Sequence, residues 1–238
     1  MALCRLSNGR FLVLDTVKLS NDEKHDINYL TNNGALVESI IATHPFHTSG
    51  FNDFYKMYPS AKYYGTPRHL RVCLDIPWAG NLNDASVRNQ WEGYGVYLRI
   101  PEGCEFVNPQ PESYNHFCNI FVYHRMSRTL YNDDTIVNWV GSYFNPTSWV
   151  AQNGLRFHPT LTNVGLYPTK DAPLAFKKWM IQLLEDFDFD ILCTAHNENV
   201  IGGAKEAIRK LLKDNDSVLN DLAAKNAAKE GQAITVGH

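Results

Sequence analysis

The first third of the chain alternates apolar runs typical of buried strands with segments that carry helix signals. Three such pairs follow one another, each a strand-like run and then a helix-like segment: 11–14 and 20–30, 37–42 and 52–58, 61–65 and 66–70. Ser20 followed by Glu23 is a capping-box pattern, and Thr66 before Pro67 marks a further helix start. This alternation favours helices packed on a sheet, so we predict an α/β layered fold.

The rest of the chain continues this pattern around two irregular regions. We predict strands at 118–123 and 129–131 that form a hairpin, a helix at 173–187, a strand at 189–195 and a helix at 204–212. Residues 77–112 are predicted to be a loop-rich excursion with strands at 94–100 and 105–107, and residues 138–170 an ordered aromatic-rich insertion. From about 214 the chain is polar. The sequence shows no linker, so we expect a single domain over 1–238.

The composition excludes several classes of partner. A net charge of −3 argues against a protein that binds nucleic acid by neutralising phosphates. The longest apolar run near the N-terminus, 11–14, is far too short for a leader or a membrane span. The five cysteines are widely spaced and form no C-x-x-C motif, which indicates the reducing cytoplasm. We therefore expect a cytoplasmic protein that acts on a small molecule, with no nucleic-acid or membrane partner and an oligomeric state left open.

Candidate ligands for a metal stand at the ends of predicted strands. They are His44, His116, Asp134 and His196. Strand ends of an α/β sheet are where loops converge on a bound ligand. Imidazole and carboxylate groups with an open coordination position suit zinc or ferrous iron. Spacing alone leaves open whether these strand ends are neighbours.

The remaining histidines have simpler interpretations. His25 and His69 lie on helix faces and are predicted to be surface or capping residues, and His124 closes a strand where a turn role is expected. His158 precedes a proline in a loop, and its participation in a site is left open.

Several segments, taken in order, resemble the metallo-β-lactamase fold superfamily. They are the strand ending in Asp15-Thr16, Thr43-His44, the stretch 130–136 (L-Y-N-D-D-T-I), and Ala195-His196 with the helix that follows Gly202-Gly203. The resemblance covers most of 3–213 and implies a four-layer αββα sandwich with mixed sheets. The R-L-S-N-G and H-R-M-S-R-T-L stretches at 5–9 and 124–130 resemble a divergent branch of unassigned function.

The resemblance also implies roles for individual residues. His44 matches the first motif histidine, His116 the third-motif ligand, Asp134 the carboxylate that bridges two metals, and His196 the last ligand. The family's second histidine, its water-orienting aspartate and the histidine that follows are replaced by Phe46, Thr48 and Ser49. His47 is one place out of register and reaches the site only if the loop is re-formed. This degenerate motif implies one divalent metal, zinc or iron, or none.

Two functions remain open at this point. The first is a metal-dependent hydrolase of an ester, lactone or thioester, with Glu198, His47 or a residue of the aromatic insertion as the general base and no single one singled out. The second is a catalytically inactive, metal-free relative that binds a small ligand or a partner protein. Phe46 and the aromatic residues Trp139, Tyr143 and Trp149 are candidate substrate-binding residues in the first case, and with Phe157 they suit a pocket wall, an interface or simple core filling.

Overall fold

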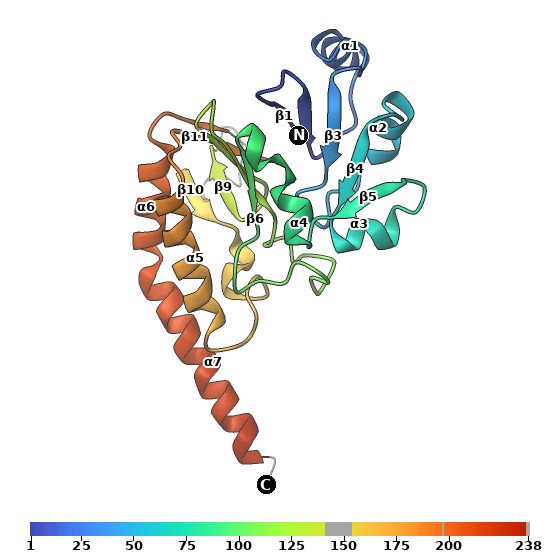
Figure 1. The fold of residues 1–238 in the computed structure, drawn as a ribbon. Coiled ribbons are helices and arrows are strands. Elements are labelled where there is room, and N and C mark those ends of the chain that lie inside the picture. Colours follow the sequence, from blue (N-terminus) through green and yellow to red (C-terminus); the bar gives the residue numbers. More distant parts are fainter. Residues whose placement is uncertain (141–153, 197, 237–238) are drawn as a thin grey trace. The chain divides into compact units, whose positions relative to one another are not determined.

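The computed structural model describes residues 1–140, 154–196 and 198–236. Its contacts divide the chain into two compact units (Figure 1). The N-terminal unit comprises 1–98 with 106–108, and the C-terminal unit comprises 99–105 with 109–238. The single domain expected over 1–238 stays a prediction.

The N-terminal unit contains one mixed sheet in the order β1-β2-β3-β4-β5. Its strands are β1 (Ala2–Arg5), β2 (Phe11–Leu14), β3 (Val37–Ile41), β4 (Lys62–Gly65) and β5 (Trp78–Asn81). The hairpin partner β1 runs antiparallel to β2, whereas β2, β3, β4 and β5 run parallel. The carboxyl ends of β2 and β3 therefore lie at the same edge of the sheet, where Asp15 and His44 follow.

The helices of this unit are α1 (Asn21–Leu30), α2 (Phe51–Met57), α3 (Pro67–Val72), α4 (Ala85–Arg88) and the 3₁₀ helix η1 (Asn89–Tyr94). The first three begin within one residue of their predicted starts, whereas α4 and η1 were not predicted. The capping box of α1 is formed, because Ser20 accepts from the Glu23 amide and Glu23 accepts from the Ser20 amide. Burial of apolar side chains such as Ile40, Phe51, Phe54 and Tyr63 joins helices and sheet into one core.

The C-terminal unit is built around a second mixed sheet. Its strands follow the order β12-β11-β8-β7: β12 (Val200–Ile201), β11 (Ile191–Thr194), β8 (Thr129–Asn132) and β7 (Phe121–His124). The predicted hairpin is confirmed as β7 and β8, and β11 pairs parallel to β8. A separate antiparallel pair is formed by β9 (Ile136–Trp139) and β10 (Gly154–Phe157). The strand β6 (Val96–Arg99) lies where the first unit passes into the second.

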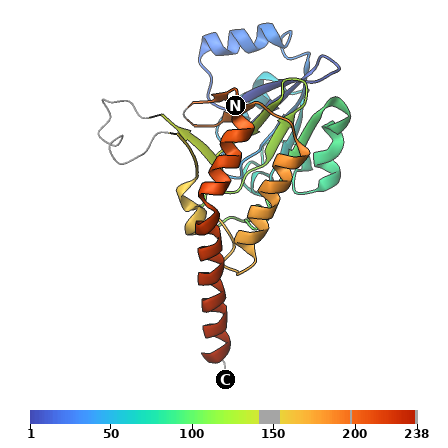
Figure 2. The same ribbon diagram turned by 90° about the vertical axis from the view of Figure 1, so that its left-hand side faces the viewer.

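Three long helices belong to this unit: α5 (Ala172–Asp186), α6 (Ala204–Asp214) and α7 (Asp216–Val236). Figure 2 shows α5 and α7 side by side, and an ion pair between Lys177 and Asp216 joins them. The apolar stripe predicted for 173–187 is buried: Phe176 packs edge-on against Phe117 and Phe157, with ring centroids 5.2 and 5.5 Å apart. A short 3₁₀ helix, η3 (Pro159–Thr162), follows β10.

Some elements differ from the sequence-based expectations. The excursion at 77–112 contains β5 and α4, and residues 105–107, predicted as a strand, are irregular. The polar stretch after 214 forms the long helix α7, with Leu219 buried completely. Among the described residues, no helix combines the length and apolar character needed to cross a membrane.

Candidate functional site

Asp134 lies in the turn that follows β8, and this turn is fixed by Asn132. The Asn132 side chain donates to the Ile136 carbonyl at 2.9 Å and accepts from the Ile136 amide at 2.8 Å. Asn132, Asp134 and Thr135 are all buried, Asp134 with 3% of its surface exposed. A buried turn needs its polar groups satisfied internally, and Asn132 supplies two of these hydrogen bonds. The Asp134 carboxylate is thereby held on a rigid support.

His196 reaches Asp134 through the strand register. Thr194 is the register partner of Asn132 in the parallel pair β11 and β8. His196 and Asp134 each lie two residues beyond these partners, so both leave the sheet at the same edge. The Thr194 hydroxyl donates to the His196 carbonyl at 2.9 Å and fixes the backbone there. Parallel pairing thus joins two residues that are far apart in sequence.

The segment that follows His116 is hydrogen-bonded to Thr135, the neighbour of Asp134. The Thr135 hydroxyl bonds to the Phe117 carbonyl and to Asn119 Oδ1, each at 2.6 Å. The Thr135 amide also donates to Asn119 Oδ1, at 3.0 Å. The segment after His116 is therefore fixed to the turn that carries Asp134.

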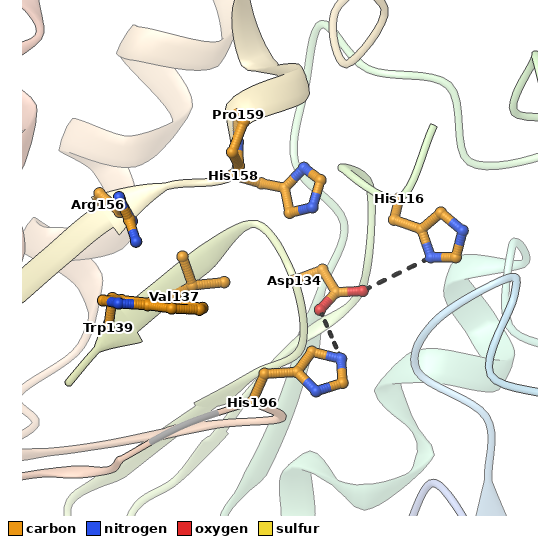
Figure 3. Close-up of a pocket in the computed structure, with 8 residues that line it drawn as sticks. All are labelled: His116, Asp134, Val137, Trp139, Arg156, His158, Pro159 and His196. Carbon is orange, nitrogen blue, oxygen red and sulfur yellow. Dashed lines mark ion pairs between the residues drawn. The ribbon is translucent and has the colours of Figure 1, made fainter. Parts of the chain in front are cut away.

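These contacts place one imidazole on each oxygen of the Asp134 carboxylate. His196 Nε2 lies 3.2 Å from Oδ1, and His116 Nδ1 lies 3.8 Å from Oδ2 (Figure 3). The His196 side chain is 59% exposed, whereas that of Asp134 is 5% exposed. The carboxylate is thus buried at the base of the site, and the imidazoles face outward.

A fourth polar side chain, His158, comes from the end of β10. The β9–β10 ladder pairs Phe157 with Ile136, and the His158 amide extends it by donating to the Thr135 carbonyl at 3.0 Å. Figure 3 shows the His158 ring next to Asp134. Burial holds the pKa of His158 below its usual range; His116 and His196 act in the same direction, and Asp134 opposes them.

A cavity of about 420 Å³ opens beside these residues. It is lined by His116, Asp134, Val137, Trp139, Arg156, His158, Pro159 and His196. This volume is within the range of about 300–1,000 Å³ found for small-molecule pockets. The wall opposite the histidines is the β9–β10 hairpin, where the Arg156 guanidinium lies 5.2 Å from the centre of the Trp139 ring.

The N-terminal unit carries the other two predicted metal ligands, His44 and His47. Asp15, in the left-handed region with a φ of 52°, accepts from the Thr43 amide at 2.8 Å and from the Thr43 hydroxyl. The buried His44 ring lies 4.2 Å from the stacked His47 ring, and His44 Nδ1 accepts from the Phe46 amide at 3.1 Å. In a neutral imidazole of this kind Nε2 carries the proton. Metal binding at His44 therefore requires loss of that proton or of the amide hydrogen bond.

His69, predicted to be a surface or capping residue, is fully buried instead. Its Nε2 donates to the His47 carbonyl at 3.1 Å, and its Nδ1 lies 2.9 Å from the Thr66 hydroxyl. Burial lowers the pKa of His69 to about 3, against the hydrogen bond to His47, which raises it. The prediction for His69 was wrong because a helix face that packs against the sheet is interior, whatever the residue on it. His69 supports the histidine turn as a neutral side chain.

The residues that the sequence singles out are distributed over both units. His116, Asp134 and His196 converge in the C-terminal unit, and Trp139 lines their cavity. Tyr143 and Trp149 lie outside the described residues. Phe46 lies in the histidine turn, and the Arg68 guanidinium carbon lies over its ring, 4.8 Å from the ring centre. Phe157 is a core residue, and Glu198 is exposed. That His44 and His47 share a site with the other ligands stays a prediction.

Sequence reasoning missed Arg156 and underweighted His158. The signal was present as alternation in 154–158, G-L-R-F-H, where Phe157 is apolar and its two neighbours are basic. A strand places alternate residues on one face. Arg156 and His158 therefore face the cavity while Phe157 enters the core.

The donor set of His116, Asp134 and His196 fits a divalent metal ion. Metal–ligand bonds of about 2.0–2.2 Å at tetrahedral angles place neighbouring ligand atoms roughly 3.3–3.6 Å apart. The separations of 3.2 and 3.8 Å lie close to this range, each to a different oxygen of the Asp134 carboxylate. Two imidazoles and a carboxylate leave coordination positions open, as catalytic zinc and ferrous-iron sites do.

Comparison with known proteins finds similarity in structure. No family model and no curated relative matches the sequence. A metallo-β-lactamase from Hirschia baltica superposes with a TM-score of 0.51 at 16% identity, over 86% of this chain and 80% of that one. The DIM-1 metallo-β-lactamase gives 0.52 at 14% identity, over 92% and 84%. A metallo-β-lactamase from Erythrobacter litoralis gives 0.50 at 13% identity, over 91% and 81%.

At this level of identity the similarity establishes the fold. The superposition covers 86% and 92% of this chain in the first two comparisons, and the chain has mixed sheets with helices, so the predicted fold class is confirmed. The chain has the metallo-β-lactamase fold.

Proposed function

We propose that the protein is a metal-dependent hydrolase that opens an ester, lactone or thioester bond, with at most one divalent metal ion. The observation that carries the proposal is the buried Asp134 carboxylate with His196 at 3.2 Å and His116 at 3.8 Å, at the base of a cavity of about 420 Å³. The fold supports it, because the solved structures from Hirschia baltica and of DIM-1, to which this chain is similar, are metallo-β-lactamases.

The metal would be zinc or ferrous iron, held by His116, Asp134 and His196. When bound in such a site, a divalent ion polarises a carbonyl and lowers the pKa of water toward about 7. The resemblance in sequence implies that His44, and His47 if its loop is re-formed, supply further ligands. With Thr48 and Ser49 in place of two motif ligands, a second metal ion lacks its usual donors.

The chain's own residues would orient the substrate. Val137, Pro159 and the Trp139 ring offer an apolar surface for its body. His158 accepts from the Thr160 amide at 3.3 Å through Nδ1, which leaves its Nε2 proton available to a substrate oxygen. Asn132 and Thr135 hold the turn under Asp134 and so preserve the spacing of the ligands.

The decisive measurement is metal content by elemental mass spectrometry. The purified full chain is stripped with chelator and incubated with zinc, iron or manganese. We expect about one equivalent of zinc or iron in the wild type, and loss of that metal in Asp134→Asn and His196→Ala, because each removes a ligand. His25→Ala, which changes an exposed histidine of α1, is the matched control and keeps the metal.

The metal-loaded chain is then assayed on nitrophenyl acetate, a simple activated ester. Activity that depends on the added metal and disappears in Asp134→Asn supports a hydrolase. His44→Ala tests the N-terminal ligands, and we expect it to weaken metal binding more than about tenfold in a chelator competition. A wild-type chain that binds no metal under any of these conditions contradicts the proposal.

A second function is favoured by the state of the histidine turn. His44 Nδ1 accepts the Phe46 amide, and Phe46, Thr48 and Ser49 replace motif ligands. These features suit a metal-free, catalytically inactive relative that uses the same cavity to bind a small ligand, or that binds a partner protein. Absence of metal together with binding of a small molecule in the cavity would favour this function.

We also propose a cytoplasmic location and a small-molecule partner. All five cysteines, Cys4, Cys73, Cys104, Cys118 and Cys193, are free thiols, which is typical of proteins from reducing compartments. Detection of a tagged form of the protein in separated cell fractions tests the location. The oligomeric state is open, and sedimentation in an analytical ultracentrifuge measures it.

A further inference from the structure

The β9–β10 wall of the cavity presents nitrogen donors on one face. Arg156 is the register partner of Val137, and Trp139 is its diagonal neighbour on the same face. His158 follows Arg156 at the strand period of two, so it leaves the same face. Figure 3 shows Arg156 and Trp139 together at one end of the cavity, with His116 at the other. The wall therefore extends from a donor pair to the candidate metal ligands.

Two nitrogen donors of this wall, on Trp139 and Arg156, lack hydrogen-bond acceptors among the described residues. Trp139 Nε1 and Arg156 Nε are buried, and neither has a hydrogen-bond partner among the described residues. A buried N–H group is costly unless an acceptor reaches it. Both groups belong to side chains that line the cavity. An acceptor on a bound molecule would satisfy them.

The charge of Arg156 is also uncompensated within the part of the chain that the structure describes, where no ion pair joins it to a carboxylate. The neighbouring segment 141–153, which the structure does not describe, contains no Asp or Glu in its sequence. Among the described residues that line the cavity, Asp134 is the one acid, and it already faces two imidazoles. The wall therefore has an excess of positive charge.

We propose that this wall binds the carboxylate of a small organic acid, with Arg156 as its principal contact and Trp139 Nε1 as a second donor. The planar guanidinium matches a carboxylate in shape, and its single positive charge balances the single negative charge of the carboxylate. The body of the acid lies along Val137, Trp139 and Pro159. This deepens the proposed function by naming its substrate class, an ester, lactone or thioester whose acid carries a free carboxylate. For catalysis it rests on that function, whereas the binding itself requires no metal.

The experiment uses phenylacetate as the probe and neutral phenylacetamide as its matched control. Binding to the metal-free full chain is measured by NMR titration at constant ionic strength. We expect phenylacetate to bind at least about tenfold more tightly than phenylacetamide, because a charged hydrogen bond is lost in the amide. Arg156→Gln should remove this preference, and Arg156→Lys should retain part of it.

Arg128→Gln is the matched control variant. Arg128 lies in the β7–β8 hairpin loop, where it pairs with the exposed Asp188 at 3.1 Å, and it should leave the preference unchanged. Equal binding of acid and amide to the wild type overturns the proposal. An unchanged preference in a folded Arg156→Gln also overturns it. If Arg156→Gln does not fold, the wild-type comparison and Arg156→Lys decide the outcome.

The two proposals fail separately. A chain that takes up no metal yet prefers phenylacetate through Arg156 contradicts the hydrolase and keeps the carboxylate site. A chain that takes up metal and hydrolyses nitrophenyl acetate, but binds acid and amide equally, keeps the hydrolase and contradicts the carboxylate site. Repeating the titration on metal-loaded chain separates binding to Arg156 from binding to the metal, because only the former is lost in Arg156→Gln.

Discussion

The turn after β3 and the turn after β8 both follow a buried parallel strand, and both carry predicted metal ligands. In the first, two histidines come from the turn itself: the Phe46 amide donates to the His44 ring at Nδ1, and the backbone carbonyl of His47 accepts from the His69 side chain. In the second, Asn132 satisfies the backbone, and the carboxylate of Asp134 faces imidazoles from two other segments. The comparison shows that ligands gathered by strand register can be held ready, whereas ligands clustered in sequence can stabilise their own turn.

The largest effect is expected where the second turn loses its support. Asn132→Ala removes two buried hydrogen bonds, to the amide and the carbonyl of Ile136, and should lower the free energy of unfolding by about 2–4 kcal/mol. Metal affinity should fall with it, because Asp134 is no longer fixed. Urea unfolding of the metal-free chain measures the first effect.

Asn138→Ala is the matched control for this variant. The Asn138 side chain makes one exposed hydrogen bond, to the Glu198 carbonyl at 3.0 Å, so its loss should cost less than about 1 kcal/mol. Equal effects of the two substitutions would show that the turn after β8 is not the more rigid support.

An intermediate effect is expected under the first turn, from His69. Its folded pKa of about 3 lies below the value of 6.5 for an unperturbed histidine, so between these pH values the unfolded chain binds a proton that the folded chain does not. Stability from this group is complete above pH 6.5 and is lost as the pH falls, by at most about 1.4 kcal/mol per pH unit. In His69→Gln this part of the pH dependence should vanish.

The measurement is chemical unfolding of the metal-free chain between pH 6 and pH 4, with His25→Gln as the exposed control. The difference in slope between wild type and His69→Gln is the quantity of interest, since other groups titrate in all variants. Parallel pH profiles would mean that His69 is accessible to protons in the folded state, and that the first turn is not closed around it.

The smallest change in stability is expected from restoring the motif in the first turn. The triple variant Phe46→His, Thr48→Asp, Ser49→His changes half-exposed or exposed positions and should alter the free energy of unfolding by less than about 1 kcal/mol. Its metal content should rise from one equivalent toward two, as elemental analysis would show. A stoichiometry that stays at one would mean that this turn does not present ligands as the resemblance implies.

The sequence predicted those parts of the molecule that local signals define. The capping box at Ser20, the hairpin of β7 and β8 and the stripe of α5 all depend on neighbours in sequence, and all are confirmed. His116, Asp134 and His196 could be named because each follows or precedes a strand. Their distances could not be predicted, because they arise from the register of β11 on β8 and from hydrogen bonds of Thr135.

The parts that sequence reasoning missed depend on packing between distant segments. His69 was misplaced because its helix face becomes interior only when α3 packs beside β4 and β5. Arg156 was missed because β10 pairs with β9 across a stretch of 14 residues, 140–153, that carries no hairpin signal. A basic residue beside an aromatic one gains meaning only when that pairing is known.

The parallel register between β8 and β11 has a consequence for identifying relatives of this chain. Asp134 and His196 stand the same number of residues beyond paired positions, Asn132 and Thr194. The number of residues between the strand end and the ligand must therefore stay constant as sequences diverge. The residues within that interval can vary freely. Insertion of a single residue after Thr194 would turn the His196 side chain away from the carboxylate while every residue type of the motif remained. Alignments that score residue types and tolerate gaps at strand ends do not detect that difference. Counting residues from the paired strand positions to each ligand does detect it.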